Sequence, residues 1–248
     1  MKAIILAAGY ATRLYPLTEN MPKCLLTVGG RTILDSICEK IVRVKKVDEI
    51  VIVTNAKFFK QLEDWKNKNT GRVPVRILND GTLSNETRLG AIGDLGLALE
   101  KVKAESDVLL LASDNLFDQE LTDFVAYTEP KKNAVSIAVY DIKDPMLAAK
   151  KFGVVEKDAS GKVLHVEEKP DHPRSSFIGM GVYYFPKNTL RLVSEYLGQK
   201  NAQDAPGYYV RWLMGKVEIF SFLFSGIWYD IGDLKALEEA NRIFKPKN

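Results

Sequence analysis

Uninterrupted apolar runs and apolar residues at helical spacing alternate along the first half of the chain. The run from Ala3 to Ala8 is typical of a parallel strand buried on both faces. Further along, Ile33, Ile37 and Ile41 recur at a spacing that places them on one face of a helix. The complete pattern predicts strands over 3–8, 50–53, 73–77 and 108–112, and helices over 33–44, 56–65 and 88–103.

This alternation of strand and helix predicts an α/β fold with a doubly wound, mostly parallel, Rossmann-like sheet. Ligands of such sheets bind beyond the carboxyl ends of the strands. The first run ends at Gly9, and the fourth ends at Ser113-Asp114-Asn115. We therefore expect both strand ends to face one crevice.

The second half of the chain loses this rhythm and is richer in predicted strands. The Pro206-Gly207 pair is interpreted as a loop signal only. No linker rich in Pro, Gly or Ser interrupts the sequence, so it predicts a single domain over residues 1–248. The second-half pattern predicts strands over 133–141, 153–155, 163–167, 177–185 and 217–224, and helices over 188–197 and 234–244.

The segment after the first strand is a candidate phosphate site. Beyond Gly9 come Thr12 and Arg13, and Lys23 follows Pro22. A buried strand that ends at glycine and is followed by backbone amides and two cations is suited to a polyphosphate. The segment is neither a Walker loop nor a dinucleotide fingerprint. The alternative is an ordinary strand-to-helix turn with solvated cations.

The amino-acid composition limits the classes of binding partner that we expect. The 248 residues include 35 basic and 32 acidic side chains, a net charge of +3. This balance argues against a nucleic-acid coat and leaves room for a local basic pocket that binds an anionic small molecule. No signal segment and no bilayer-spanning apolar run is evident, so we expect a cytoplasmic protein without a membrane partner.

Acidic residues follow several predicted strands. Asp114 follows one, Glu167-Glu168-Lys169-Pro170 another, and Asp230 lies in Trp228-Tyr229-Asp230-Ile231-Gly232-Asp233. Mg²⁺ takes one or two protein carboxylates together with substrate phosphates, and Asp114 with Asp230 would meet that need. The alternative for each aspartate is a turn residue that caps a helix.

Taken together, these segments resemble the sugar-1-phosphate nucleotidylyltransferases, and above all glucose-1-phosphate thymidylyltransferase-like enzymes. The resemblance covers nearly the whole chain in the family's order. The motifs are Leu6-Ala7-Ala8-Gly9-x-x-Thr12-Arg13-Leu14-x-Pro16-Leu17-Thr18 with Pro22-Lys23, Ser113-Asp114-Asn115, Phe152-Gly153-Val154-Val155-Glu156, Glu167-Glu168-Lys169-Pro170, Gly181-Val182-Tyr183-Tyr184-Phe185 and Trp228-x-Asp230-x-Gly232.

The resemblance implies a nucleotide-diphospho-sugar transferase fold with a nucleotide-binding half (1–130) and a β-rich sugar-phosphate-binding half (131–248). It also implies the substrates, a nucleoside triphosphate and a sugar 1-phosphate, and a nucleoside diphosphate sugar and pyrophosphate as products. The implied site residues are Arg13 and Lys23 for catalysis, Asp114 and Asp230 for Mg²⁺, Ala8, Gly9, Tyr10, Ala11, Thr12, Gly81, Ser84 and Asn85 for the nucleotide, and Asn115, Gly153, Glu168 and Lys169 for the sugar phosphate.

Two departures from the family pattern and two alternative functions remain at this stage. The family usually has glycine at the positions of Ala11 and Ser113, so either the loop avoids a left-handed conformation at Ala11 or it tolerates the strain. One alternative function is a cytidylyltransferase for a non-sugar phosphate such as phosphocholine. Its aromatic cage would come from Tyr208, Tyr209, Trp212 and Trp228. The other is a nucleotide-sugar-binding regulatory subunit without turnover. The aromatic segment 208–212 could serve a homo-oligomer interface, but packing in the core explains it equally well.

Overall fold

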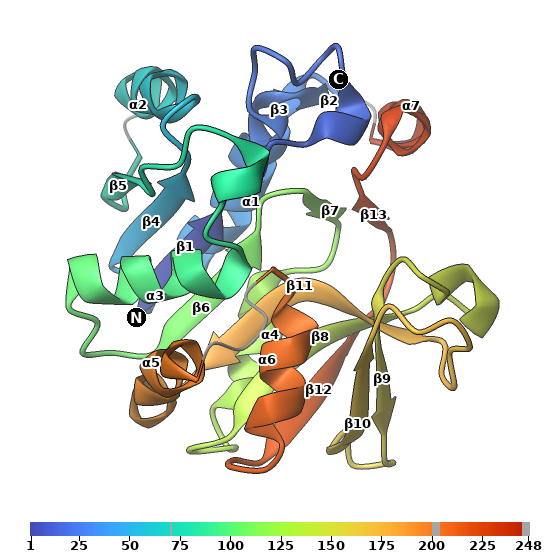
Figure 1. Cartoon of the computed structure of the whole chain (residues 1–248). Coiled ribbons are helices and arrows are strands. Elements are labelled where there is room, and N and C mark those ends of the chain that lie inside the picture. The colour runs from blue at the N-terminus through green and yellow to red at the C-terminus, as the bar shows by residue number, and fades with distance from the viewer. Residues whose placement is uncertain (70, 200–203, 245–248) are drawn as a thin grey trace. The chain divides into compact units, whose positions relative to one another are not determined.

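The computed structural model describes residues 1–69, 71–199 and 204–244 (Figure 1). By its internal contacts the chain divides into two compact units, each made of segments that are not contiguous in sequence. The first unit contains Met1–Arg88, Leu111–Thr122 and Gly226–Asn248, and the second contains Leu89–Leu110 and Asp123–Ser225.

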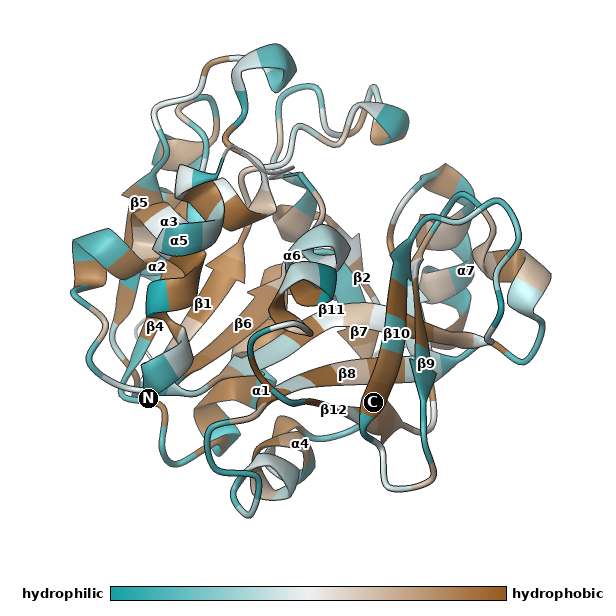
Figure 2. Cartoon of the chain, turned by 60° about the horizontal axis from the view of Figure 1, so that its bottom comes forward, coloured by the Kyte–Doolittle hydropathy of each residue, from teal (hydrophilic) through white to brown (hydrophobic). Residues whose placement is uncertain are grey.

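The first unit is built on parallel strands that alternate with helices. Strand β1 (Lys2–Leu6) pairs in parallel with β4 (Glu49–Thr54), and β4 pairs in parallel with β5 (Val75–Asn79). Figure 2 shows that β1 is among the most hydrophobic segments, as a strand with both faces covered must be. Helix α1 (Ile33–Arg43) and helix α2 (Phe59–Lys68) follow the expected helical pattern.

Short elements complete the first unit. Strand β7 (Asn115–Phe117) pairs antiparallel with β13 (Trp228–Asp230), so this two-stranded ribbon joins segments more than a hundred residues apart. The remaining elements are β2 (Thr27–Val28), β3 (Arg31–Thr32), helix α7 (Leu234–Ile243) and 3-10 helices over Thr12–Leu14, Lys23–Leu25 and Asn85–Thr87.

The second unit is rich in antiparallel strands. Strand β11 (Phe177–Phe185) pairs antiparallel with β8 and β9, β9 pairs antiparallel with β10, and β12 pairs in parallel with β8. Strand β6 (Val108–Ala112) begins in this unit and ends in the first. Helix α4 (Leu121–Thr128) begins in the first unit and continues in the second. The other elements are β8 (Val135–Asp141), β9 (Gly153–Lys157), β10 (Val163–Glu168), β12 (Ile219–Phe224), α3 (Ala91–Val102), α5 (Arg191–Gly198), α6 (Pro206–Leu213) and 3-10 helices over Pro145–Ala148 and Lys187–Thr189.

The predicted α/β class, with parallel strands in the first part and a β-rich second part, is confirmed. The interpretation of Pro206-Gly207 as a loop is wrong, because helix α6 begins at Pro206. Proline is favoured in the first turn of a helix, where its missing N–H has no intrahelical partner in any case. Strands β7 and β13 and helix α4 were not predicted. In the described ranges no helix combines the length and apolar character that crossing a membrane requires.

Candidate active site

The loop after β1 adopts the left-handed conformation that the sequence left open. Ala11 has φ 47° and ψ 42°. The protein therefore tolerates the strain of a left-handed alanine, about 1–2 kcal/mol, at the position where the family usually has glycine. The fully buried Thr18 hydroxyl donates to Ala11 O at 2.8 Å, and Leu14 N–H donates to the same oxygen at 2.9 Å. These two bonds hold the Ala11 carbonyl in place.

A buried asparagine braces the same loop from the neighbouring strand. Asn55 lies directly after β4, and its Nδ2 donates to Ala8 O at 2.9 Å while its Oδ1 accepts from Phe58 N–H at 3.1 Å. Its exposed surface is zero. With the carbonyls of Ala8 and Ala11 bonded to the protein, this stretch of loop is fixed against the body of the first unit. The sequence analysis missed Asn55, although a polar residue at the end of a buried strand is a signal for such a role.

Lys23 and Asp114 form a direct ion pair in the first unit. Lys23 Nζ lies 2.9 Å from Asp114 Oδ2, and the lysine side chain is only 13% exposed. Ser113 N–H donates to Leu6 O at 3.2 Å, so the end of β6 lies against the end of β1. The two strand ends thus lie side by side, whereas the expected crevice in front of them stays a prediction.

Asp230 and Arg13 approach the same cluster. Ile231 N–H donates to Asp114 O at 2.9 Å, which ties β13 to the end of β6. A Cβ on Gly232 would lie 3.6 Å from Asp230 Oδ2 and 3.7 Å from Arg13 Nη2, so both charged groups approach that bare Cα. The first unit thus gathers two carboxylates and two cations from three parts of the chain that are distant in sequence.

The electrostatics of this cluster suit a divalent cation. Burial, and next the Asp114 carboxylate, raise the pKa of Asp230 to about 6, while Lys23 and Arg13 lower it. Among the described residues no group of three or more His, Cys, Asp or Glu side chains could hold a metal ion. Mg²⁺ needs only one or two carboxylates beside substrate phosphates, so the pair Asp114 and Asp230 fits this ion.

The segment expected to contact the base is tethered to the loop. Tyr10 is buried, and its hydroxyl lies 3.3 Å from Thr82 Oγ1, while Thr82 O accepts from Ala56 N–H at 3.0 Å. Gly81 has φ 79°, which favours glycine at this turn. The predicted residues Ser84 and Asn85 follow at the start of the 3-10 helix. Tyr10 therefore has a structural role through its side chain, and the sequence analysis missed Thr82.

In the second unit, Gly153, Glu168 and Lys169 come together. Glu168 pairs with Gly153 across β9 and β10, and a Cβ on Gly153 would lie 2.9 Å from Glu168 Oε2. Lys169 has φ 50°, and its Nζ lies 3.8 Å from Glu168 Oε1. Burial raises the pKa of Glu168, and Lys169 and the Gly207 N–H oppose that shift.

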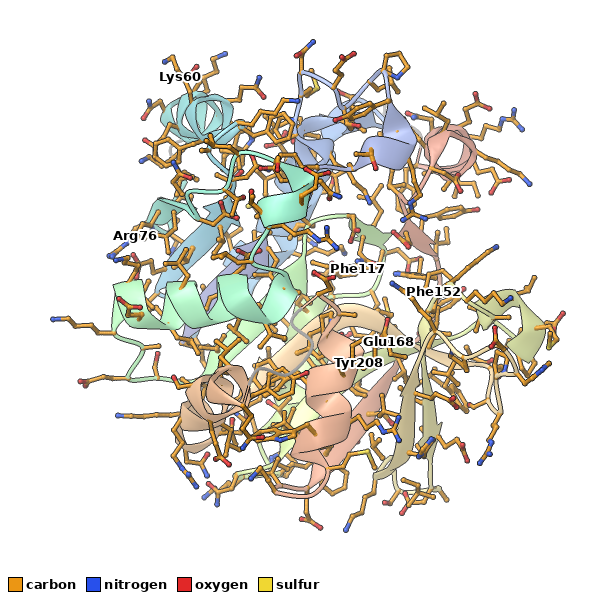
Figure 3. The ribbon with its side chains drawn as sticks, viewed as in Figure 1. Lys60, Arg76, Phe117, Phe152, Glu168 and Tyr208 are labelled. Atoms are coloured by element: carbon orange, nitrogen blue, oxygen red, sulfur yellow. The ribbon has the colours of Figure 1, made fainter. Side chains whose placement is uncertain are left out.

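Gly207 is a residue of this group that the sequence analysis missed. A Cβ at this position would lie 2.0 Å from Glu168 Oε2, so only glycine allows the first turn of α6 to approach the carboxylate. Figure 3 shows Glu168 next to Tyr208, the residue that follows Gly207. A Pro-Gly pair at the start of a helix was the available signal, and it was interpreted as a loop instead.

The aromatic residues of the second unit do not support the cage suggested for phosphocholine. Tyr209 has zero exposed surface, and its ring packs against those of Phe185, Tyr196 and Trp212 at centroid distances of 6.0, 5.0 and 6.0 Å. A side chain whose ring is occupied in this way belongs to the core. Tyr208 is 43% exposed.

Curated proteins of similar sequence match nearly the whole chain. The "Bifunctional protein GlmU" of Methanocaldococcus jannaschii is 28% identical over 251 residues, which is 100% of this chain and 55% of that protein. The "Putative mannose-1-phosphate guanyltransferase" of Sulfolobus acidocaldarius is 27% identical over 232 residues, 94% of this chain and 60% of that protein. The chain thus spans little more than half the length of these curated relatives.

A solved structure shares the fold. The crystal structure of a putative glucose-1-phosphate thymidylyltransferase from Bacillus anthracis, in complex with a sucrose, superposes with a TM-score of 0.85 at 23% identity. The match covers 100% of this chain and 96% of that one. A family model described as "Nucleotidyl transferase" matches residues 2–246. The resemblance drawn from the motifs is therefore confirmed, and this chain belongs to the nucleotidyl transferase family.

Proposed function

We propose that the protein transfers a nucleotidyl group from a nucleoside triphosphate to a sugar 1-phosphate. The supporting observation is the cluster of Arg13, Lys23, Asp114 and Asp230 at the carboxyl ends of β1 and β6. Family membership and the names of the relatives point to the same class of reaction. The proposal does not rest on the fold alone, because the charges of this cluster match the chemistry of two polyanionic substrates.

In the proposed reaction a phosphate oxygen of the sugar phosphate attacks the α-phosphorus of the triphosphate. The new oxygen–phosphorus bond forms as the bond to the β-phosphate's bridging oxygen breaks, and pyrophosphate leaves. The nucleophile is already ionised, so the site requires no general base. Positioning and neutralisation of charge carry such transfers.

The residues of the first unit would divide this work. The loop from Ala8 to Thr12 would bind the phosphates with its backbone, and Arg13 and Lys23 would neutralise charge on the transferred group and on pyrophosphate. Asp114 and Asp230 would hold Mg²⁺, which supplies further charge neutralisation when bound. Gly81, Ser84 and Asn85 would contact the nucleotide base.

The residues of the second unit would bind the acceptor. Glu168 accepts hydrogen bonds and lies against Gly153 and Gly207, which suits a hydroxyl-bearing sugar. Lys169, whose side chain is 54% exposed, would pair with the sugar's phosphate. Asn115, in the first unit, is also proposed for the sugar phosphate. The single-domain organisation, a cytoplasmic location and a homo-oligomer stay predictions.

A panel assay tests the proposal. Each common nucleoside triphosphate is incubated with a set of sugar 1-phosphates and with phosphocholine, with Mg²⁺ or with chelator, and pyrophosphate release is measured. We expect Mg²⁺-dependent release with at least one sugar 1-phosphate. Release with phosphocholine alone would show that the acceptor is phosphocholine and not a sugar 1-phosphate. The absence of release with every pair would favour a binding protein without turnover.

A further inference from the structure

Two side chains of the β7–β13 ribbon form a chain of hydrogen bonds that ends on Asp114. Trp228 Nε1–H donates to Asn115 Oδ1 at 2.7 Å. Asn115 Nδ2 in turn donates to Asp114 Oδ1 at 2.8 Å. The other carboxylate oxygen, Asp114 Oδ2, accepts from Lys23 Nζ at 2.9 Å. Both oxygens of Asp114 are therefore bonded, each to a different partner.

The chemistry of the two ends fixes the orientation of the middle group. An indole N–H can only donate, and an ionised carboxylate can only accept. The Asn115 amide therefore satisfies both neighbours in one orientation, with its oxygen towards Trp228 and its nitrogen towards Asp114. A flipped amide would place two oxygens against each other and leave the indole N–H facing an NH₂ group. Asn115 is 5% exposed, so water cannot easily replace either bond.

The register of the ribbon explains why this chain forms. Asp230 pairs with Asn115 and Trp228 pairs with Phe117, so residues two apart on each strand share one face. Trp228 reaches Asn115 diagonally across that face, a distance that a large aromatic side chain can span. The same face carries Asp230. The ribbon thus places the residues that support Asp114 on the same face as Asp230.

We infer that Trp228 and Asn115 are positioning residues that fix the rotation of the Asp114 carboxylate. With Oδ1 held by the Asn115 amide, Oδ2 is presented to Lys23 and to the charges that gather there. This role adds to the sugar-phosphate contact proposed for Asn115. The inference rests on the proposed function, because it is through Asp114 that the two residues would affect turnover.

A double-mutant cycle tests the route of the effect. Trp228→Phe keeps the ring in the ribbon but removes the donor, and we expect kcat to fall about three- to tenfold, the range of one net hydrogen bond. Asn115→Ala should cost about 10- to 100-fold, as loss of a group that orients a ligand typically does. Because Trp228 acts through Asn115, Trp228→Phe should cost nothing further in the Asn115→Ala background. A full additional loss there would overturn the inference.

A measurement without substrates tests the geometry. In protein labelled with ¹⁵N-asparagine, the side-chain amide of Asn115 is assigned by its loss in Asn115→Ala. Trp228→Phe should shift this resonance and speed its hydrogen exchange about tenfold or more, because the amide loses its fixed orientation. An unchanged shift and exchange rate in Trp228→Phe would overturn the inference.

Trp65→Phe is the matched control. It also removes an indole bond to a first-unit carboxylate, since Trp65 Nε1–H donates to Asp35 Oδ1 at 2.9 Å. Both its kcat and the Asn115 resonance should equal those of the parent protein, and equal effects in the two variants would overturn the inference. If the parent protein shows no transfer with any substrate pair, the proposed function fails, whereas the exchange experiment still decides whether Trp228 orients Asn115.

Discussion

Ala11 and Lys169, one in each unit, are both non-glycine residues in the left-handed conformation, and the protein supports them in different ways. Ala11 follows β1 in the first unit, with φ 47°, and Lys169 follows β10 in the second, with φ 50°. At Ala11 the support includes a side chain, because the buried Thr18 hydroxyl donates to Ala11 O beside the Leu14 N–H. At Lys169 it comes from the backbone, because Lys169 N–H donates to Phe152 O at 3.1 Å.

The two units also differ in what holds their carboxylates in place. In the first unit Asp114 is held by other side chains, those of Lys23 and Asn115. In the second unit Glu168 is enclosed by the backbone of Gly153 and Gly207. The side-chain bonds at Asp114 fix charges that can interact with a transferred phosphate. The backbone contacts at Glu168 limit the space around that carboxylate. We therefore expect substitutions in the first unit to act on turnover, and those in the second to act on acceptor binding.

The largest effect is expected from Lys23→Ala. Loss of a charge that stabilises the transition state typically costs 10²- to 10³-fold in kcat. Steady-state pyrophosphate release measures it. Lys60→Ala is the matched control, because Lys60 is 86% exposed on α2 and points outward in Figure 3. Near-normal turnover of Lys23→Ala would remove Lys23 from the mechanism.

Gly207→Ala should act on the acceptor. The new Cβ would lie 2.0 Å from Glu168 Oε2, so the carboxylate or α6 must move, at a cost of about 1–3 kcal/mol for such overpacking. We expect the KM for the sugar phosphate to rise about tenfold, with the KM for the nucleotide unchanged. In Gly198→Ala the new Cβ has no neighbour within 4 Å, and both KM values should stay unchanged. A rise in the nucleotide KM alone would contradict the division of roles.

Thr18→Val tests the side-chain support of the first turn. The change keeps the shape but removes the donor to Ala11 O, and the free energy of unfolding should fall by about 1 kcal/mol. Thermal or urea denaturation measures the loss. Thr27→Val, at an exposed position in β2, provides the comparison and should change little. Equal stabilities of the two variants would show that Ala11 needs no such support.

Ala11→Gly should stabilise the protein slightly. Relief of the left-handed strain gains about 1–2 kcal/mol, and the greater freedom of glycine in the unfolded chain offsets about 0.5–1 kcal/mol of it. Ala149→Gly, at φ −54°, has no strain to relieve and should destabilise instead. The sign of the difference between the two unfolding free energies is the test, and a destabilised Ala11→Gly would contradict it.

The smallest effect is a pH dependence in the second unit. The Ser176 hydroxyl, and next Lys143, lower the pKa of Asp141 to about 2. A lowered carboxyl pKa contributes stability above its unfolded value near 4, and this stability is lost as the pH falls towards 2. Asp141→Asn should therefore flatten the stability profile between pH 4 and pH 2. A variant profile as steep as that of the parent protein would assign the acid limb to other groups.

Sequence patterns were sufficient where burial alone sets the structure. The apolar runs predicted β1, β4 and β6, because strands covered on both faces must be hydrophobic along their length. The meeting of the β1 and β6 ends followed from the rule that parallel strands present their carboxyl ends to one edge. By contrast, β7 and β13 have three residues each, too few to show any periodicity.

The supports of the candidate site could not be predicted, because they depend on side-chain contacts that form only in the folded chain. Asn55 and Thr18 are ordinary polar residues in sequence, and only folding brings them onto Ala8 and Ala11. The role of Gly207 depends likewise on the approach of α6 to Glu168. The conformation of Ala11 was open for the same reason, since the Thr18 bond to its carbonyl is visible only in the structure.

Isotope transfer tests the central claim most directly. With the substrate pair that the panel selects, the sugar 1-phosphate carries ¹⁸O in its non-bridging phosphate oxygens, and the products are followed by ³¹P NMR. Attack of the sugar phosphate on the α-phosphorus predicts ¹⁸O in the bridge between the two phosphorus atoms of the nucleoside diphosphate sugar, and none in pyrophosphate. A product bridge without ¹⁸O, or label in pyrophosphate, would contradict the account.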